Sequence, residues 1–386
     1  MALARRQFFR QMFTGLGAAA ALPAIGVPAL AGEAAWPGNW RTLQAGGAGA
    51  PVLLDSNENA YGPSPEAYAS LEGSAAIANR YPKHEYEDLA EAIAAKHSVK
   101  PEQVTLGCGS SENLRMAAEA FLGPGRTLIY ATPTFEFIAH RAGDTGAQLA
   151  AVPLTKEYAH DLDAMLARAA GGAGLVYLCN PNNPTATLTP RKDLESFLEK
   201  LPASYYVLMD EAYHHFVVDA PAYTSFLDRP VDDPRLIVTR TFSKIYGLAG
   251  ARIGYAVAAT ETTRSLAARK MQFAVNVLGA RAALAAWNDA DAVPKGAARN
   301  AADRREFYKQ AKSRSLEVIE SQTNFVMVHT GRPAQEVIEH FRANSVMIGR
   351  PFPPMTDYVR ISLGTPEDMQ VFWRVWDLLP AKNLPA

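Results

Sequence analysis

Cysteine is almost absent from this chain: Cys108 and Cys179 are the only two in 386 residues, so at most one disulfide bond can form. Each lies in an apolar, strand-like stretch beside a loop rich in glycine or proline. We predict that both are buried free thiols, because packed cysteine behaves as a small hydrophobic side chain. A single disulfide in an oxidising compartment is the alternative.

The sequence also lacks an excess of charge of one sign. Its formal net charge is -1, from 38 Lys and Arg against 39 Asp and Glu, so there is no broad basic field to attract nucleic acid or anionic lipid. Low-complexity segments are absent beyond the N-terminus, and 48% of the residues are hydrophobic, which excludes a disordered or fibrous protein. The length predicts one large globular unit or two moderate domains.

The N-terminus is typical of a targeting signal. Arg5 and Arg6 precede an apolar pair, and a weakly hydrophobic stretch rich in Gly and Ala follows over residues 14–30. Ala29-Leu30-Ala31 then offers small residues at the two positions that a signal peptidase recognises. Residues 1–31 therefore resemble a twin-arginine export signal, which predicts passage through the twin-arginine translocation machinery into a bacterial periplasm.

A short N-terminal anchor is the alternative for this segment, although its prolines disfavour a stable spanning helix. If the export interpretation is wrong, the protein is cytoplasmic. No later stretch has the length and apolarity of a transmembrane helix.

Beyond the signal, strand and helix patterns alternate. Short apolar runs with β-branched or aromatic members predict strands at residues 104–106, 127–130, 174–178, 205–209, 236–239 and 253–258. Helical spacing of apolar residues lies between several of them, as in residues 86–97, 113–121 and 191–200. This alternation predicts an α/β domain with a largely parallel sheet flanked by helices.

The C-terminal part changes its apolar period. Residues 274–313 are strongly helical, and the remainder predicts strands at 324–329 and 358–363 and helices at 333–344 and 366–379. The predicted parts are a signal peptide at 1–31, an N-terminal arm at 32–65, a large α/β domain at 66–275 and a small α+β domain at 276–386.

Polar clusters follow the predicted strands, at the edge where parallel sheets bind ligands. Gly109-Ser110-Ser111-Glu112 opens a helix, where backbone N–H groups and the helix dipole favour an anion such as a phosphate. The alternative is an ordinary helix cap.

A second polar cluster is Asn180-Pro181-Asn182-Asn183-Pro184-Thr185. Two prolines fix its backbone and present the amide of Asn183 as a donor to a phenolate-like oxygen; the alternative is a plain turn.

Asp210 and Tyr213 follow the predicted strand at 205–209. A carboxylate at the end of a buried strand is costly without a cationic partner. A protonated pyridine nitrogen is such a partner, and its protonation makes the ring an electron sink. Tyr213 is near enough to hydrogen-bond the 3-oxygen of that ring. A helix cap or a metal ligand is the alternative; His214 and His215 lack a further ligand pair at a suitable spacing, so we predict no metal site.

Lys244 lies in Thr241-Phe242-Ser243-Lys244, between a hydroxyl and an aromatic-rich turn. Desolvation there lowers the pKa of a lysine and leaves the neutral, nucleophilic amine that an imine requires. Thr241, Ser243 and Arg252 are candidate phosphate ligands, with Arg252 as a bidentate, permanently charged clamp. The alternative, a lone surface lysine, is disfavoured by the glycines and the arginine that follow.

Together these motifs resemble, in order, those of the class I/II (fold-type I) aminotransferases that depend on pyridoxal 5′-phosphate (PLP). The sharpest are the runs at 180–185, at 210–213, and at 241–244 followed by Gly-Leu-Ala-Gly-Ala-Arg-Ile-Gly-Tyr at 247–255. The histidinol-phosphate aminotransferase branch is the most similar. The resemblance extends from Leu54 to Leu379 and implies a seven-stranded, mostly parallel sheet, a PLP cofactor and a homodimer with shared active sites.

The resemblance also implies residue roles. Lys244 forms the Schiff base with PLP and shuttles the proton, Asp210 pairs with the pyridine nitrogen, and Phe135 stacks on the ring. Asn183 and Tyr213 hold the 3-oxygen. The cofactor phosphate is held near Gly109, Ser110, Ser111, Thr241, Ser243, Arg252 and, from the neighbouring subunit, Tyr81. The substrate is bound by Asn57, Asn183, Arg350 and Arg360, with Arg360 on its α-carboxylate and Arg350 where the histidinol-phosphate branch holds a substrate phosphate.

The implied activity is transfer of an amino group from an amino acid to a 2-oxo acid. A PLP-dependent oxidase, lyase or racemase on the same fold is the alternative, because small pocket changes decide which bond to the α-carbon breaks. A non-catalytic binding protein is disfavoured by the presence of Lys244, Asp210 and Arg252. Since histidine biosynthesis is cytoplasmic, export predicts an amine donor other than histidinol phosphate.

Overall fold

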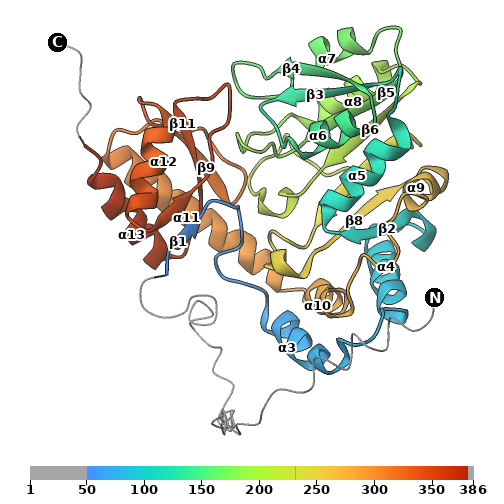
Figure 1. The fold of residues 1–386 in the computed structure, drawn as a ribbon, viewed down its shortest axis with the longest axis horizontal. Coiled ribbons are helices and arrows are strands. Elements are labelled where there is room, and N and C mark those ends of the chain that lie inside the picture. The colour runs from blue at the N-terminus through green and yellow to red at the C-terminus, as the bar shows by residue number, and fades with distance from the viewer. Residues whose placement is uncertain (1–49, 231, 381–386) are drawn as a thin grey trace, which may run out of the picture. The chain divides into compact units, whose positions relative to one another are not determined.

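Seven strands form one sheet in the computed structural model, which describes residues 50–230 and 232–380 (Figure 1). These strands are β2 (Val104–Cys108), β3 (Thr127–Thr132), β4 (Gln148–Pro153), β5 (Gly174–Cys179), β6 (Tyr205–Asp210), β7 (Leu236–Thr241) and β8 (Ile253–Ala258). Their spatial order is β2-β8-β7-β6-β5-β3-β4. Only β8 runs antiparallel to its neighbours, so the prediction of a mostly parallel seven-stranded sheet is confirmed.

Helices cover both faces of this sheet, which explains why its central strands are apolar throughout. In β5, Leu175, Tyr177 and Cys179 pack on one face, and Val176 and Leu178 on the other. The first face is covered by α5 (Ser110–Phe121), α6 (Phe137–Asp144) and α9 (Thr260–Ala267). The second is covered by α3 (Pro65–Ser74), α4 (His84–His97), α7 (Leu162–Ala169), α8 (Arg191–Lys200) and α10 (Val277–Asn288).

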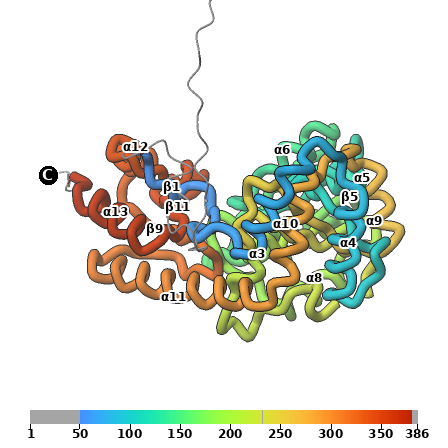
Figure 2. The backbone as a smooth tube through the Cα atoms, turned by 90° about the horizontal axis from the view of Figure 1, so that it is seen from below, coloured from blue at the N-terminus to red at the C-terminus, as the bar shows by residue number. Residues whose placement is uncertain are grey.

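A second hydrophobic core lies in the C-terminal part. It contains β1 (Val52–Leu54), β9 (Phe325–His329), β10 (Val346–Ile348), β11 (Tyr358–Ser362), α11 (Ala292–Ser313), α12 (Ala334–Ala343) and α13 (Pro366–Asp377). Strand β1 pairs in parallel with β10, and β9 pairs antiparallel with β11. The N-terminal strand is therefore fixed to the C-terminal part, while the long helix α11 runs from this core toward the large sheet (Figure 2).

Local sequence signals set several helix starts. Ser64 accepts a hydrogen bond from the backbone N–H of Ala67, and Pro65 occupies the first turn of α3, where its missing N–H costs nothing. At the start of α13, Thr365 and Asp368 form a reciprocal capping box. Single-turn 3-10 helices occur at Ala75–Ile77, Pro101–Gln103, His214–Phe216 and Ala249–Ala251.

The structure also refines the sequence predictions. The helix expected from residue 113 begins three residues earlier, at Ser110, and the helical region 274–313 divides into α10 and α11. Strand β4 was not predicted: it is a mostly exposed edge strand, and its apolar run, residues 149–152, is half alanine, which disfavours strands. Both cysteines are free, as predicted, and Cys179 is buried; the prediction that Cys108 is buried was wrong, because it is only partly buried. The domain boundaries stay predictions.

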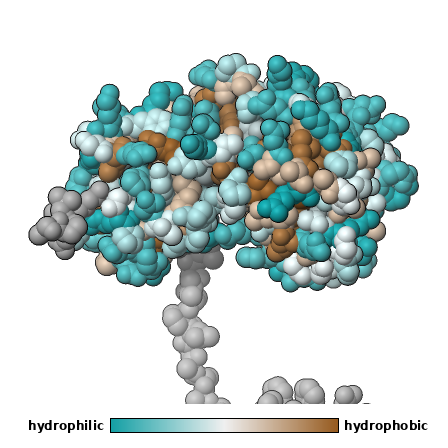
Figure 3. All heavy atoms as spheres, turned by 90° about the horizontal axis from the view of Figure 1, so that it is seen from above, coloured by the Kyte–Doolittle hydropathy of each residue, from teal (hydrophilic) through white to brown (hydrophobic). Residues whose placement is uncertain are grey.

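The surface of the described residues is mixed in hydropathy. On the face drawn in Figure 3, hydrophobic patches lie between hydrophilic side chains. Over residues 50–230 and 232–380, no helix combines the length and apolarity needed to cross a membrane. The predicted signal at 1–31 lies outside the described residues.

Candidate active site

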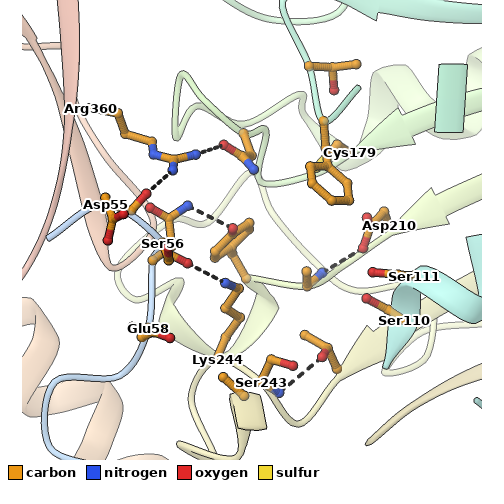
Figure 4. Close-up of a pocket in the computed structure, with 18 of the residues that line it drawn as sticks. Asp55, Ser56, Glu58, Ser110, Ser111, Cys179, Asp210, Ser243, Lys244 and Arg360 are labelled. Carbon is orange, nitrogen blue, oxygen red and sulfur yellow. Dashed lines mark hydrogen bonds between the residues drawn. The ribbon is translucent and has the colours of Figure 1, made fainter. Parts of the chain in front are cut away.

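A cavity of about 620 Å³ lies where the predicted polar clusters meet. The carboxyl ends of the parallel strands point to this edge, and β8, being antiparallel, places its first residues there too. Predicted site residues that line the cavity are Asn57, Ser110, Ser111, Phe135, Asn183, Asp210, Tyr213, Thr241, Ser243, Lys244, Arg252, Arg350 and Arg360. Figure 4 shows Lys244, Asp210 and Arg360 reaching it from different parts of the chain.

Lys244 follows β7 and points its amine into the cavity (Figure 4). Its Nζ donates to the carbonyl oxygen of Ser56 at 3.1 Å and lies 5.6 Å from the centre of the Tyr213 ring. Burial and, after it, the positive charge of Arg360 lower the pKa of Lys244 to about 8. Near neutral pH the amine is therefore mostly protonated, but a far larger fraction is neutral, and so nucleophilic, than for an ordinary lysine.

Asp210 ends β6 and is 2% exposed. Its carboxylate accepts hydrogen bonds from the Tyr177 hydroxyl at 2.9 Å, from the backbone N–H of Ala212 at 3.2 Å and from the Thr239 hydroxyl at 3.4 Å. Burial nevertheless raises the pKa of Asp210 to about 6. Among the described residues it makes no ion pair, so a cation that enters the cavity here gains a buried anionic partner.

The start of α5 and the start of β8 form a cup. Gly109 precedes the helix with φ +71°, and a Cβ there would collide with the guanidinium of Arg252. A Cβ at Gly254 would collide with the backbone nitrogen of Ser110. Both glycines thus allow a close approach that a side chain would block. Because Gly109 is the N-cap residue and no side chain caps α5, the backbone N–H groups of Ser110 and Ser111 have no partner among the described residues and can bind an incoming anion, whereas that of Glu112 donates to the Gly109 oxygen at 3.2 Å.

Hydroxyl groups and Arg252 complete the cup. Arg252 donates to the Ser243 hydroxyl at 3.3 Å, and the backbone N–H of Ser243 donates to the Thr241 hydroxyl at 3.1 Å. Ser110 and Ser111 face the same space from α5 (Figure 4). The alternative that the serines only cap the helix is not supported, because neither of them occupies the capping position.

Arg360, on β11, reaches the cavity from the C-terminal core. It donates to the Asn183 side-chain oxygen at 2.7 Å and to the backbone oxygen of Asp55 at 2.6 Å. Burial lowers the pKa of Arg360 to about 10. Among the described residues its buried Nε has no hydrogen-bond partner. Since Asn183 accepts with its oxygen, its amide nitrogen remains a donor, as the sequence predicted.

Asn57 connects the two cores at the site. Its Nδ2 donates to the Tyr213 hydroxyl at 3.0 Å, its Oδ1 accepts from the Ser362 hydroxyl at 3.2 Å, and its backbone oxygen accepts from Asn324. The φ of Asn57 is 54°, a left-handed conformation that asparagine tolerates better than most residues. Tyr213 is thereby fixed, with its hydroxyl proton available to the cavity.

Two predicted cofactor residues lie outside the cavity lining. Gly109 forms the floor of the cup through its contact with Arg252. Tyr81 is 69% exposed and packs against Phe273, with the ring centres 4.4 Å apart and the rings tilted by 32°. Its predicted contact is with a neighbouring subunit, so this position neither supports nor opposes the prediction.

Sequence reasoning missed Tyr177 and Glu136. The Tyr177 hydroxyl donates the shortest of the hydrogen bonds that the Asp210 carboxylate accepts. Glu136 forms an ion pair with Arg350 at 2.7 Å. Strand alternation in β5 places Tyr177 on the face shared with Cys179, but only the pairing register of β5 and β6 brings it to Asp210. No local signal relates Glu136 to an arginine 214 residues away.

His214 and His215, where the sequence predicted no metal site, are partly buried against aromatic rings. His214 hydrogen-bonds the Tyr223 hydroxyl at 3.0 Å, and His215 lies edge-on to Tyr246. Burial lowers the pKa of both well below the usual value. Within the described parts of the chain, no group of three or more potential ligands is arranged to hold a metal ion.

These residues fit a phosphorylated pyridine aldehyde. The glycine-lined cup with Arg252 suits its phosphate, Asp210 suits its ring nitrogen, and Lys244 suits its aldehyde. The strongest indication is Asp210, a buried carboxylate that lacks a cationic partner among the residues described.

Known proteins are similar to this chain in sequence. A family model described as aminotransferase class I and II matches residues 50–375. The histidinol-phosphate aminotransferase of Moorella thermoacetica is 37% identical over 325 residues, which cover 84% of this chain and 84% of the relative. That of Symbiobacterium thermophilum is 37% identical over 325 residues, covering 83% of this chain and 88% of the relative.

A solved structure is also similar. The histidinol-phosphate aminotransferase of Sinorhizobium meliloti, crystallised in complex with pyridoxal-5'-phosphate, superimposes with a TM-score of 0.79. It is 26% identical in sequence, and the match covers 85% of this chain and 92% of that one.

The pKa of Lys244 gives a testable pH dependence. Because this pKa is lowered to about 8, the amine is protonated below that pH and neutral above it. The rate at which cofactor-free protein takes up pyridoxal phosphate, followed by stopped-flow absorbance, should rise with pH and level off above about 8. In Arg360→Met the pH midpoint of this rise should shift upward, because the variant removes a positive charge that lowers the pKa of Lys244. A rate that keeps rising to pH 10 in the unchanged protein contradicts this pKa.

Proposed function

Because the chain belongs to the class I and II aminotransferase family, and is therefore a PLP-dependent enzyme that transfers amino groups, we propose that its donor is an α-amino acid whose carboxylate binds Arg360. The acceptor is a 2-oxo acid, which presents a carboxylate at the same place. The observation that carries this proposal is the position of Arg360: the residue is only 8% exposed, and it lines the same cavity as Lys244 and Asp210.

The chemistry divides between the cofactor and the chain. When bound, pyridoxal phosphate supplies an aldehyde for the amine and a ring that accepts electrons from the carbon bearing it. Asp210 contributes a negative charge that keeps the ring nitrogen protonated, and Tyr177 and Thr239 keep that carboxylate in place. Asn183 and Tyr213 offer donors to the ring oxygen.

Lys244 is the group that moves the proton. Its lowered pKa allows the neutral amine to accept a proton at Nζ near neutral pH and to return it. The backbone oxygen of Ser56, 3.1 Å away, accepts a hydrogen bond from Nζ and so orients it in the cavity. The chain thus provides one base that is already directed at the reacting centre.

Arg360 orients the substrate. A guanidinium can donate two parallel hydrogen bonds to a carboxylate, and its burial strengthens that interaction relative to water. Asn183 and the backbone of Asp55 hold the guanidinium at 2.7 and 2.6 Å. The carboxylate of the donor is therefore fixed at a defined distance from Lys244, which sets the angle of the bond to be broken.

The half-reactions test this function. Incubation with an amino acid alone should change the visible absorbance of the bound cofactor and release one 2-oxo acid per site, and a second 2-oxo acid should restore the spectrum. In Arg360→Lys the value of kcat/KM for both substrates should fall roughly 10- to 100-fold, the expected loss of a charge-assisted hydrogen bond, while the protein still takes up cofactor. Equal kcat/KM values in the two proteins refute the role of Arg360, and hydrogen peroxide in place of the returning spectrum refutes transamination.

We further propose a homodimer in which Tyr81 reaches the phosphate cup of the partner. Tyr81, Met271 and Phe273 are exposed by 69%, 61% and 55%. Monomeric proteins rarely expose large apolar side chains together, so this cluster is a candidate interface. It is also tied to the cup, since Glu112 accepts hydrogen bonds from the backbone N–H groups of both Cys108 and Met271.

Sedimentation velocity tests the dimer. The unchanged protein should sediment at twice the mass of one chain, and Phe273→Asp should shift it toward the monomer, because it places a charge in an apolar contact. Cofactor affinity should fall in the same variant. Leu149→Asp, at an exposed hydrophobic residue on edge strand β4, serves as the control and should remain dimeric. A monomeric unchanged protein contradicts the proposal.

Export through the twin-arginine pathway is the last part of the proposal. It is supported by Arg5 and Arg6 ahead of a Gly- and Ala-rich stretch and by the small residues at 29 and 31. In cells expressing the full chain, the protein should appear in the periplasmic fraction, shortened by about the length of the signal. Arg5→Lys with Arg6→Lys should retain it in the cytoplasm. A full-length cytoplasmic protein in both cases contradicts export.

A further inference from the structure

Glu136 and Arg350 form an ion pair at the cavity. The Arg350 guanidinium donates to the Glu136 carboxylate at 2.7 Å. Arg350 lines the cavity from the segment after β10, and Glu136 directly precedes α6 and follows Phe135, which also lines it. The pair therefore connects the C-terminal part to the segment that carries the predicted ring-stacking residue.

Arg350 and Arg360 share one aromatic ring. Their guanidinium carbons lie 4.4 and 4.7 Å from the centre of Phe352. Two positive groups this close repel each other, and the charge of Arg350 contributes to lowering the pKa of Arg360. Glu136 neutralises the charge of Arg350. Of the two guanidinium groups at the substrate end of the cavity, only that of Arg360 is therefore without a carboxylate partner among the described residues.

We propose that Glu136 is a specificity-determining residue: it occupies Arg350 and so favours substrates with one anionic group over substrates with a second one on the side chain. This inference rests on the proposed function, in which Arg360 takes the α-carboxylate. A side-chain carboxylate or phosphate must displace Glu136 to use Arg350. An uncharged side chain leaves the pair intact.

The geometry favours this role over a purely structural one. Glu136 is the N-cap residue directly before α6, yet its side chain makes no capping hydrogen bond to that helix. Both side chains of the pair are about half exposed, at 50% and 45%, and exposed pairs of this kind contribute little to folding stability. The carboxylate of Glu136 thus acts mainly on the charge of Arg350.

A pair of matched ligands tests the proposal. Glutarate has two carboxylates, and pentanoate has one on a chain of the same length. Calorimetry on the cofactor-loaded protein gives the ratio of their affinities. In Glu136→Gln this ratio should rise roughly fivefold in favour of glutarate, the scale of a half-exposed ion pair, and the gain should shrink at high salt. Half-reaction kcat/KM values for L-glutamate and its neutral isostere L-glutamine should shift by a similar factor.

Controls separate this effect from a structural one. Glu261→Gln breaks an exposed pair with Arg264 far from the cavity and should leave the ratio unchanged. In the double variant that combines Glu136→Gln with Arg350→Gln, the rise in the affinity ratio should vanish, because the Arg350 guanidinium that Glu136 would have released is no longer present. An unchanged ratio in Glu136→Gln, or an equal loss for both ligands, overturns the proposal. A protein that transaminates no donor refutes the proposed function instead, and the glutarate ratio still decides the role of Glu136.

Discussion

A buried carboxylate without a cation is the constraint on which the rest of the site depends. Asp210 is removed from water at the end of β6, and hydrogen bonds from Tyr177, Ala212 and Thr239 offset only part of that cost, because its pKa is still raised to about 6. A protonated pyridine nitrogen of pyridoxal phosphate would supply the missing stabilisation. The cofactor and the apoprotein would then each contribute half of one buried ion pair.

The sheet explains how these groups come together. Parallel strands direct their carboxyl ends to one edge. There Asn183 follows β5, Asp210 ends β6 and Lys244 follows β7, and each is a candidate for one part of the chemistry. The single antiparallel strand, β8, adds Arg252 at its start. The C-terminal core then contributes Arg360 on β11. A cavity between two cores therefore combines a fixed cofactor site with a separately supported substrate site.

The sequence predicts the parts of this site that lie next to strands. Lys244, Asp210 and Asn183 each follow an apolar run, so their positions at the sheet edge follow from strand order alone. Tyr177 and Glu136 could not be found in that way. The contact of Tyr177 depends on the register in which β5 pairs with β6. That of Glu136 depends on how the C-terminal part packs across the cavity, which no local pattern encodes.

The two arginines at the substrate end differ in their surroundings, and this difference matters more than their number. Arg360 is 8% exposed, and its partners are a side-chain amide oxygen and a backbone oxygen, which carry no charge. Its positive charge is therefore available to a substrate carboxylate in a medium that screens it weakly. Arg350 is half exposed and already paired with Glu136. In the proposed function, recognition of the anion common to all substrates therefore belongs to a buried charge without an anionic partner, and discrimination among side chains belongs to a solvent-screened ion pair that a competing anion can open.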